Sequence, residues 1–210
     1  HGWSSPFRLE PQGVPPSLVM SDTVSVNSPS IAPASEPNGD LWVFGYGSLM
    51  WRPGFRFAEK SPALLRGAHR ALCVYSVRHR GTTEKPGLVL GLDHGGSCHG
   101  IAFRVAAADV AETHAYLTER EQMNRVYREV LRPIRLQDGR TVPALAYIVD
   151  RSHTQYARGL THETLLAHIR QGHGESGACR DYVLNTLASL AELGIDDHAL
   201  SWLGEALASA

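Results

Sequence analysis

The stretch Leu41-Trp42-Val43-Phe44-Gly45-Tyr46-Gly47-Ser48-Leu49-Met50-Trp51 is the starting point for interpreting the rest of the chain. Its first four residues are apolar or aromatic, and two glycines then bracket a tyrosine. This pattern predicts a buried strand that ends in a loop. Because glycines place little bulk over the backbone, the N–H groups of such a loop suit an anion such as a carboxylate or a phosphate. A strand followed by an ordinary tight turn is the structural alternative.

Three known glycine-containing loops do not match this stretch. The dinucleotide fingerprint fails because Met50 stands where its third glycine belongs, and a phosphate-binding loop needs Gly-Lys-Ser/Thr, whereas Leu49 follows Ser48. The nucleophile elbow fails because Tyr46, not glycine, stands two places before Ser48. The carboxylate of a small molecule is therefore the favoured ligand. The candidate binding residues are Gly45, Tyr46, Gly47, Ser48, Leu49 and Met50.

The composition is that of an ordinary globular protein of 210 residues with a formal net charge of −1. This charge gives no electrostatic case for nucleic acid, and no apolar run approaches the ~20 residues of a membrane-spanning helix. Cys73, Cys98 and Cys179 are odd in number and show no Cys-x-x-Cys spacing, so neither a disulfide framework nor a zinc site is expected. A reducing, cytoplasmic compartment fits this cysteine usage best.

Residues 1–39 differ from the rest of the chain, because they are rich in proline and serine and have hardly any apolar periodicity. Such a segment cannot bury enough apolar surface to offset the entropy of ordering it. We therefore expect a flexible N-terminal tail at residues 1–39 and one folded domain at residues 40–210.

The order of the predicted elements indicates an α+β fold. Strands are expected at residues 64–75, with a bulge at Gly67, and at residues 88–92 and 100–105, which would form a hairpin turned at residues 93–97. Residues 127–136 and 142–149 form a second predicted hairpin. Helical periodicity follows at residues 162–170, 179–190 and 199–207. The expected sheet is thus mostly antiparallel, with helices flanking it.

A further predicted helix, residues 110–121 with Asp109 as its N-cap, carries the candidate acid. At about 100° per residue, Val110, Leu117 and Glu121 share one face of this helix, whereas Glu112 and Glu119 face the opposite side. A carboxylate on an apolar stripe is unusual, since burying it is costly without a partner. Such burial favours the protonated form, so Glu121 is a candidate general acid and base.

Two structural alternatives remain open at this stage. Glu121 could instead pair with Arg120, Arg125 or Arg128 and have no chemical role. His114, which shares the stripe, is more typical of a satisfied core residue than of a ligand, and no histidine spacing in the chain predicts a metal site.

Four motifs in order resemble the ChaC-like γ-glutamylcyclotransferases. They are Val43 to Trp51, His79-Arg80-Gly81-Thr82 with Lys85-Pro86-Gly87, Tyr116-Leu117 with Arg120-Glu121, and Gly174-Glu175-Ser176-Gly177 with Arg180-Asp181-Tyr182. The resemblance covers about residues 41–205. It implies a compact, barrel-like sheet with a pocket at its mouth. It also implies that Glu121 is the catalytic residue and that Arg80 and Tyr127 line the pocket.

The activity implied by this resemblance is cleavage of glutathione into 5-oxoproline and cysteinylglycine, without a metal or another cofactor. Two alternatives stay open: a cyclotransferase acting on other γ-glutamyl amino acids or amines, and a non-catalytic module that binds a γ-glutamyl metabolite for regulation. Glutathione is the expected small-molecule partner. The sequence leaves the oligomeric state open, a monomer included.

Overall fold

A computed structural model of the protein describes residues 38–122 and 125–208, without the side chains of Glu121 and Gln122. The predicted tail therefore lies almost entirely outside the described residues, and the boundary at residue 40 stays a prediction. The elements are β1 (Leu41–Gly45), η1 (Ser48–Met50), β2 (Glu59–Ser76), β3 (Gly87–Val105), η2 (Ala107–Asp109), α1 (Val110–Gln122), β4 (Tyr127–Leu136), β5 (Thr141–Val149), α2 (His162–Gln171), β6 (His173–Gly174), β7 (Gly177–Ala178), α3 (Cys179–Glu192) and α4 (His198–Ala208).

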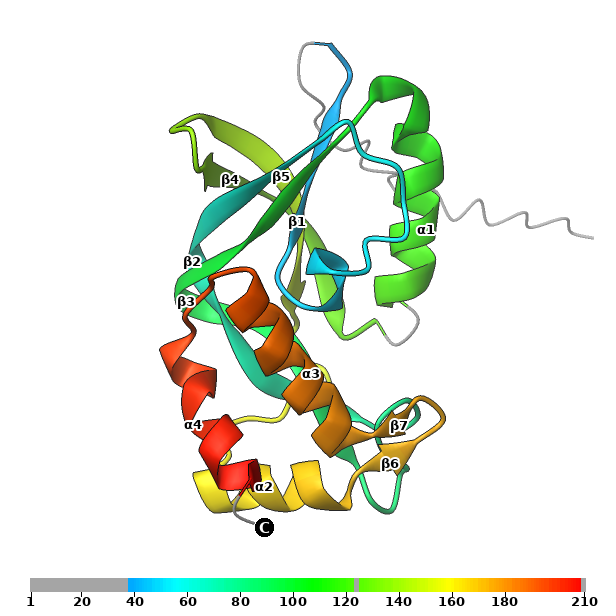
Figure 1. Ribbon diagram of the computed structural model, residues 1–210. Helices are drawn as coiled ribbons and strands as arrows, with labels where there is room; N and C mark the ends of the chain where they lie inside the picture. The colour runs from blue at the N-terminus through cyan, green and yellow to red at the C-terminus, as the bar shows by residue number, and fades with distance from the viewer. Residues whose placement is uncertain (1–37, 123–124, 209–210) are drawn as a thin grey trace, which may run out of the picture. The chain divides into compact units, whose positions relative to one another are not determined.

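Five strands form a closed barrel in the order β1-β3-β2-β4-β5 (Figure 1). Neighbouring strands pair antiparallel, except that β5 runs parallel to β1 and makes one further parallel contact with β3. Residues of β1 are buried throughout, since this short strand is covered on both faces. The α+β class and the barrel-like sheet expected from the sequence are confirmed.

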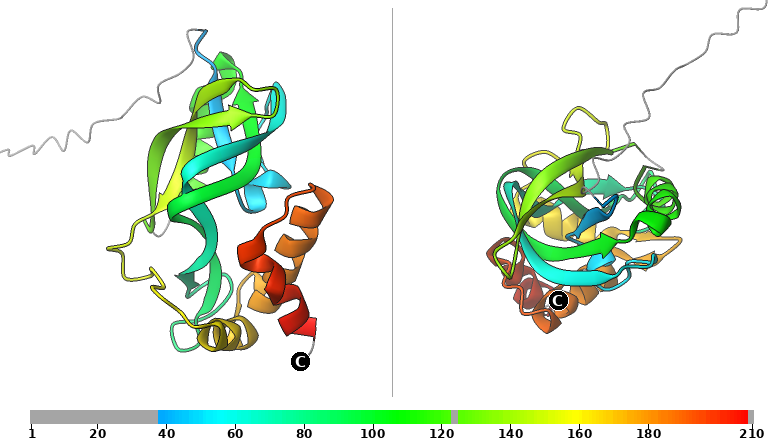
Figure 2. Two further views of the ribbon diagram at one scale, coloured as in Figure 1. Left: turned by 90° about the vertical axis from the view of Figure 1, so that its left-hand side faces the viewer. Right: turned by 90° about the horizontal axis from the view of Figure 1, so that it is seen from above.

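The long strands β2 and β3 connect the barrel to the C-terminal helices. Only the first half of β2 pairs with β4, at Ala63–Leu65, and only the last part of β3 pairs with β1. The remaining halves continue as a two-stranded arm, and α2, α3 and α4 pack on this arm (Figures 1 and 2). The end of the barrel and the helices on the arm are thus the two parts of the fold that can border a site.

The predicted hairpin between residues 88–92 and 100–105 is wrong, because β3 is one continuous strand. Its middle residues pair with β2, Asp93 opposite His69 and Ser97 opposite Arg66. The register shifts between Arg66 and Ala68, which confirms the bulge predicted at Gly67. Gly95 and Gly96 lie opposite this bulge with φ values of 95° and 71°, so these glycines accommodate an irregular ladder rather than a turn.

Asp109 is not the N-cap of α1. It is the last residue of η2, which leads directly into α1, and its N–H donates to the carbonyl of Ala106 at 2.8 Å. The burial of Leu117 and the exposure of Glu112 and Glu119 agree with the predicted orientation of this helix. The position of Glu121 on the apolar face stays a prediction, because its side chain lies outside the described residues. Within the described residues, none of the helices is both long enough and apolar enough to cross a membrane.

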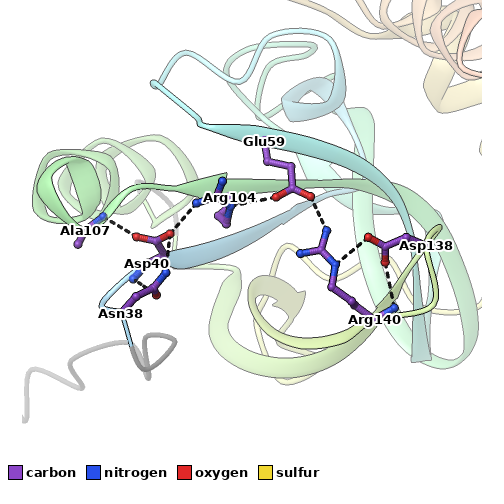
Figure 3. Close-up of polar contacts among 7 residues, drawn as sticks. All are labelled: Asn38, Asp40, Glu59, Arg104, Ala107, Asp138 and Arg140. Carbon is purple, nitrogen blue, oxygen red and sulfur yellow. Dashed lines mark hydrogen bonds and ion pairs between the residues drawn. The ribbon is translucent and has the colours of Figure 1, made fainter.

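The far end of β1, where the strand begins, is held by a network of charged groups (Figure 3). Arg104 pairs with Asp40 at 2.7 Å and with Glu59 at 3.0 Å, and Arg140 pairs with Glu59 at 2.5 Å. The side chain of Arg104 lowers the pKa of Asp40, and Arg140, followed by Arg104, lowers the pKa of Glu59. These contacts join β1, β2, β3 and the β4–β5 turn at the end of the barrel opposite the loop after Gly45.

Candidate functional site

A cavity of about 870 Å³ lies at the end of the barrel where β1 ends. Its walls come from the loop after β1, from α1 and the start of β4, from the arm and the loop after β2, and from the β6–β7 hairpin and α3. The lining residues are Tyr46, Gly47, Ser48, Leu49, Trp51, Arg52, Gly54, Val74, Tyr75, Ser76, His79, Arg80, Val89, Leu90, Tyr116, Arg120, Val126, Tyr127, Ser176, Tyr182, Asn185, Ala188, Ser189 and Glu192. Segments that lie far apart in the sequence therefore meet in one space.

Residues 46–49 of the loop after β1 line this cavity. The loop turns through η1, in which Met50 N–H donates to the carbonyl of Gly47 at 2.9 Å. The N–H of Met50 is thus already used, whereas no loop hydrogen bond within the described chain uses the N–H groups of Gly47, Ser48 or Leu49. Gly47 has a φ of −129°, so it does not need the left-handed conformation. These three N–H groups are the candidates for binding an anion.

Six of the eight predicted binding residues line the cavity: Tyr46, Gly47, Ser48, Leu49, Arg80 and Tyr127. The other two lie behind them. Gly45 pairs with Ile101 as the last residue of β1, and a Cβ added there would lie 3.2 Å from the Cβ of Leu49. Met50 is buried in the core. Gly45 and Met50 therefore have supporting positions, and the glycine is needed for the close approach of strand and loop.

Arg70 supports the loop from behind, and the sequence interpretation missed it. This residue is 2% exposed, and its Nε donates to the carbonyl of Tyr46 at 2.5 Å. Its Nη2 donates to the carbonyl of His99 at 2.7 Å, and its Nη1 pairs with Asp197 at 2.5 Å. A single buried guanidinium thus joins the loop, β3 and the segment between α3 and α4.

Arg120 connects the same loop to α1. Its Nη2 donates to Ser48 Oγ at 2.8 Å, and its Nη1 donates to the carbonyl of Arg52 at 2.9 Å and to Tyr116 Oη at 2.7 Å. Glu121 is the next residue of the helix, and its side chain lies outside the described part of the structure. Since Tyr116 and Arg120 line the cavity, the last turns of α1 lie at its wall.

A second polar cluster holds α1 against the barrel. His114 Nε2 lies 2.9 Å from Glu129 Oε1 on β4, and Tyr147 Oη on β5 donates to Glu129 Oε2 at 3.0 Å. His114 therefore has the structural role that the sequence favoured for it. This cluster fixes the helix two turns before Glu121.

The opposite wall forms where the loop after β2 meets the β6–β7 hairpin. The N–H groups of Glu175 and Ser176 donate to the carbonyls of Arg78 and His79, both at 2.9 Å. The two backbones come so close that a Cβ on Gly174 would lie 2.2 Å from the carbonyl oxygen of Arg78. A Cβ on Gly81 would likewise lie 2.2 Å from the backbone nitrogen of Gly87, so close backbone packing explains a glycine in each of the two motifs.

Two tyrosines form hydrogen bonds to the backbone of Leu90, which lines the cavity. Tyr127 Oη donates to the carbonyl of Leu90 at 2.8 Å, and the N–H of Leu90 donates to Tyr182 Oη at 3.2 Å. These bonds connect β4 and α3 to the arm.

The three cysteines are free and buried, as expected for a chain without a disulfide framework. Burial raises the pKa of Cys73 to about 12 and that of Cys98 to about 11. Burial also raises the pKa of Cys179, whose Sγ donates to the carbonyl of Leu88 at 3.1 Å. None of these thiols is poised as a thiolate nucleophile.

Comparison with known proteins agrees with this geometry. The sequence profile of the family described as "ChaC-like protein" matches residues 41–209. This chain belongs to the ChaC-like family. The match covers all the motifs quoted above and both walls of the cavity.

Among the curated relatives, the Escherichia coli K12 "Glutathione-specific gamma-glutamylcyclotransferase" is 34% identical over 163 residues, which cover 78% of this chain and 71% of that protein. The Rattus norvegicus "Glutathione-specific gamma-glutamylcyclotransferase 1" is 33% identical over 174 residues, covering 78% of each chain. A crystal structure of a yeast γ-glutamyl cyclotransferase specific to glutathione superimposes with a TM-score of 0.74 at 22% identity, covering 82% of this chain and 97% of that one. The yeast structure supports the barrel fold of this ChaC-like protein.

Proposed function

We propose that this ChaC-like protein cleaves the γ-glutamyl bond of glutathione by intramolecular cyclisation. The products are 5-oxoproline and cysteinylglycine. The observation that carries the proposal concerns the loop after β1, residues 45–50, which we call the glycine loop. This loop and the last turns of α1 line one cavity in a member of this family. The names of the curated relatives support glutathione as the substrate.

The reaction joins the α-amine nitrogen of the substrate to its own γ-carbonyl carbon and breaks the bond from that carbon to the cysteine nitrogen. Because the nucleophile is tethered to the electrophile, much of the entropic cost is met within the substrate once it is correctly folded. The protein must hold the α-carboxylate, take a proton from the amine and give a proton to the leaving nitrogen. No water or external redox partner enters the balance.

The loop after β1 is suited to the first task. Gly47, Ser48 and Leu49 line the cavity, and their N–H groups can donate to a carboxylate or to the oxyanion of the tetrahedral intermediate. The cation of Arg120, anchored on Ser48, adds a favourable field for an anion at this place.

We assign the proton transfers to Glu121, which follows Arg120 in the helix. A single carboxylate can take the amine proton and then return it to the leaving nitrogen. Among the described residues lining the cavity, Glu192 is the one acidic side chain, so it is the alternative for this role.

The experiment is to incubate the purified protein with glutathione and to measure 5-oxoproline by chromatography. Glu121→Gln keeps the shape of the side chain but cannot carry the proton, so turnover should fall at least about a hundredfold. Glu119→Gln, an exposed neighbour on α1, is the matched control and should retain activity.

Three results would change the assignment. Near-normal turnover in Glu121→Gln would move the proton transfers to Glu192. If γ-glutamyl amino acids were cleaved and glutathione were not, the protein would be a cyclotransferase of other preference. Binding of glutathione without any turnover would favour a regulatory module.

A further inference from the structure

Arg80 lines the cavity in the loop after β2, and none of the described residues balances its charge. Its Nη1 donates to the main-chain carbonyl of Ser176 and lies 3.5 Å from that of Ala178, while its guanidinium lies over the ring of Tyr182 at 5.2 Å. In the described part of the chain no carboxylate pairs with it. Its neighbour Arg78, by contrast, pairs with Glu175 at 2.8 Å and does not line the cavity.

The surroundings of Arg80 fix its orientation without neutralising it. Two carbonyls accept from Nη1, and the ring of Tyr182 packs on one face of the guanidinium. The remaining N–H groups can donate to an incoming ligand. A carboxylate is the matching group, because arginine binds it through charge-assisted, often paired, hydrogen bonds. Ser176 and Asn185, which line the same space, add further polar groups.

The cavity extends along α3. One face of α3, consisting of Tyr182, Asn185, Ser189 and Glu192, lines it. Ten residues of α-helix span about 15 Å. The start of α3 follows the β6–β7 hairpin, on which Arg80 is anchored, and its end lies near η1 (Figures 1 and 2). An extended tripeptide spans at most about 11 Å. A γ-glutamyl tripeptide whose α-carboxylate lies at the loop can therefore extend its other end towards Arg80.

We propose that Arg80 binds the carboxylate at the far end of the substrate, on the part that leaves as the amine. The protein thereby selects γ-glutamyl peptides that end in a free carboxylate. This inference rests on the proposed function, and it names the part of the substrate that determines specificity. Loss of an interaction made equally in the ground state and the transition state raises KM and leaves kcat unchanged.

The test compares two substrates in three proteins. The substrates are glutathione and the same tripeptide with its terminal carboxylate converted to an amide, which has nearly the same shape and no charge. The proteins are the wild type, Arg80→Gln and the matched control Arg78→Gln in the same loop. The rate of 5-oxoproline release gives kcat and KM for each pair.

For the wild type we expect kcat/KM to be about 10- to 100-fold higher for glutathione than for the amide, as for a charge-assisted hydrogen bond. Arg80→Gln should lose this preference through a higher KM for glutathione, with the amide little affected. Arg78→Gln should keep the preference of the wild type. Arg80→Lys, which keeps the charge but not the planar fork, should keep part of it.

The proposal is overturned if the wild type does not discriminate between the two substrates, or if Arg80→Gln slows both equally, as a purely structural role would. If Arg80→Gln fails to fold, Arg80→Lys is used instead. A reduced preference for glutathione over the amide in Arg80→Lys supports the proposal, and equal slowing of both substrates overturns it. If the wild type forms 5-oxoproline from neither compound, the proposed function is wrong. The proposed role of Arg80 is then wrong as well.

Discussion

Gly47 and Ser48 are adjacent, but they contribute to the site in different ways. A Cβ on Gly47 would point at Leu90, 3.6 Å from its Cδ1, so a small side chain fits the protein but takes up space in the cavity. The hydroxyl of Ser48 is used in a bond to Arg120. The glycine is thus needed for the ligand and the serine for anchoring α1.

We predict that Gly47→Val impairs activity more than Ser48→Ala. Ser48→Ala removes one hydrogen bond to a charged group, worth about 1.5–3 kcal/mol at most, and should lower kcat/KM for glutathione about tenfold. Gly47→Val places a branched side chain where substrate must approach and should weaken competition by 5-oxoproline as well. Melting temperatures of both variants check that they fold. Loss of activity in Ser48→Ala with activity retained in Gly47→Val would show that a side chain, and not the main chain, recognises substrate.

Single residues differ in how far the sequence could predict them. Residues 46–49 and Arg80 belong to local motifs, and they line the cavity. Arg70 belongs to none, although a signal was present: Ala68, Arg70 and Leu72 alternate along β2 and are all buried. An arginine on the inward face of a strand indicates a buried partner, but its partner Asp197 is 127 residues away and cannot be found from local spacing.

At the scale of elements, the bond between Arg70 and Asp197 couples the C-terminal helices to the loop after β1. Asp197→Asn keeps the shape of the side chain and its ability to cap α4, but it removes the charge opposite a buried arginine. Breaking a buried pair in this way costs about 3–5 kcal/mol. We therefore predict a lower free energy of unfolding and a lower kcat/KM for glutathione.

The control for this variant is Asp138→Asn, which removes the charge from the exposed pair with Arg140. It should leave the melting temperature and the activity nearly unchanged, because exposed pairs contribute little. Equal effects in the two variants, measured by urea unfolding and 5-oxoproline release, would contradict the coupling.

Among the elements, those with a strong local pattern were predicted well. The strands β4 and β5 begin within a residue of their expected positions, and α2, α3 and α4 agree equally well, because apolar periodicity and turn residues coincide there. The continuity of β3 was missed. Gly95 and Gly96 are typical of a turn, and only the pairing with the bulged β2 keeps them in the ladder.

At the scale of the whole molecule, we expect the free energy of unfolding to depend on pH through the charged network of Figure 3. The pKa of Glu59 is lowered from 4.5 by Arg140 and Arg104, so its charged form is bound more tightly in the folded than in the unfolded state. Its contribution is complete above pH 4.5 and is lost as the pH falls through the lowered, folded pKa.

We predict that Glu59→Gln lowers the melting temperature at neutral pH and that the difference from the wild type disappears below the folded pKa. Glu112→Gln, an exposed change on α1, is the control and should follow the wild type throughout. Melting temperatures measured from pH 7 down to acid unfolding test this. A difference that persists unchanged in acid would show that packing, and not charge, holds Glu59.

Arg70 and Asp197 are 127 residues apart in the sequence, which also has a consequence for synthesis on the ribosome. The barrel strands, which end at Val149, leave the exit tunnel before the segment that carries Asp197 has been translated. Until then Arg70 lacks its partner Asp197, so fewer contacts hold the guanidinium that donates to the carbonyl of Tyr46. We therefore expect the loop after β1 to gain its full support only when the segment that carries Asp197 packs against Arg70.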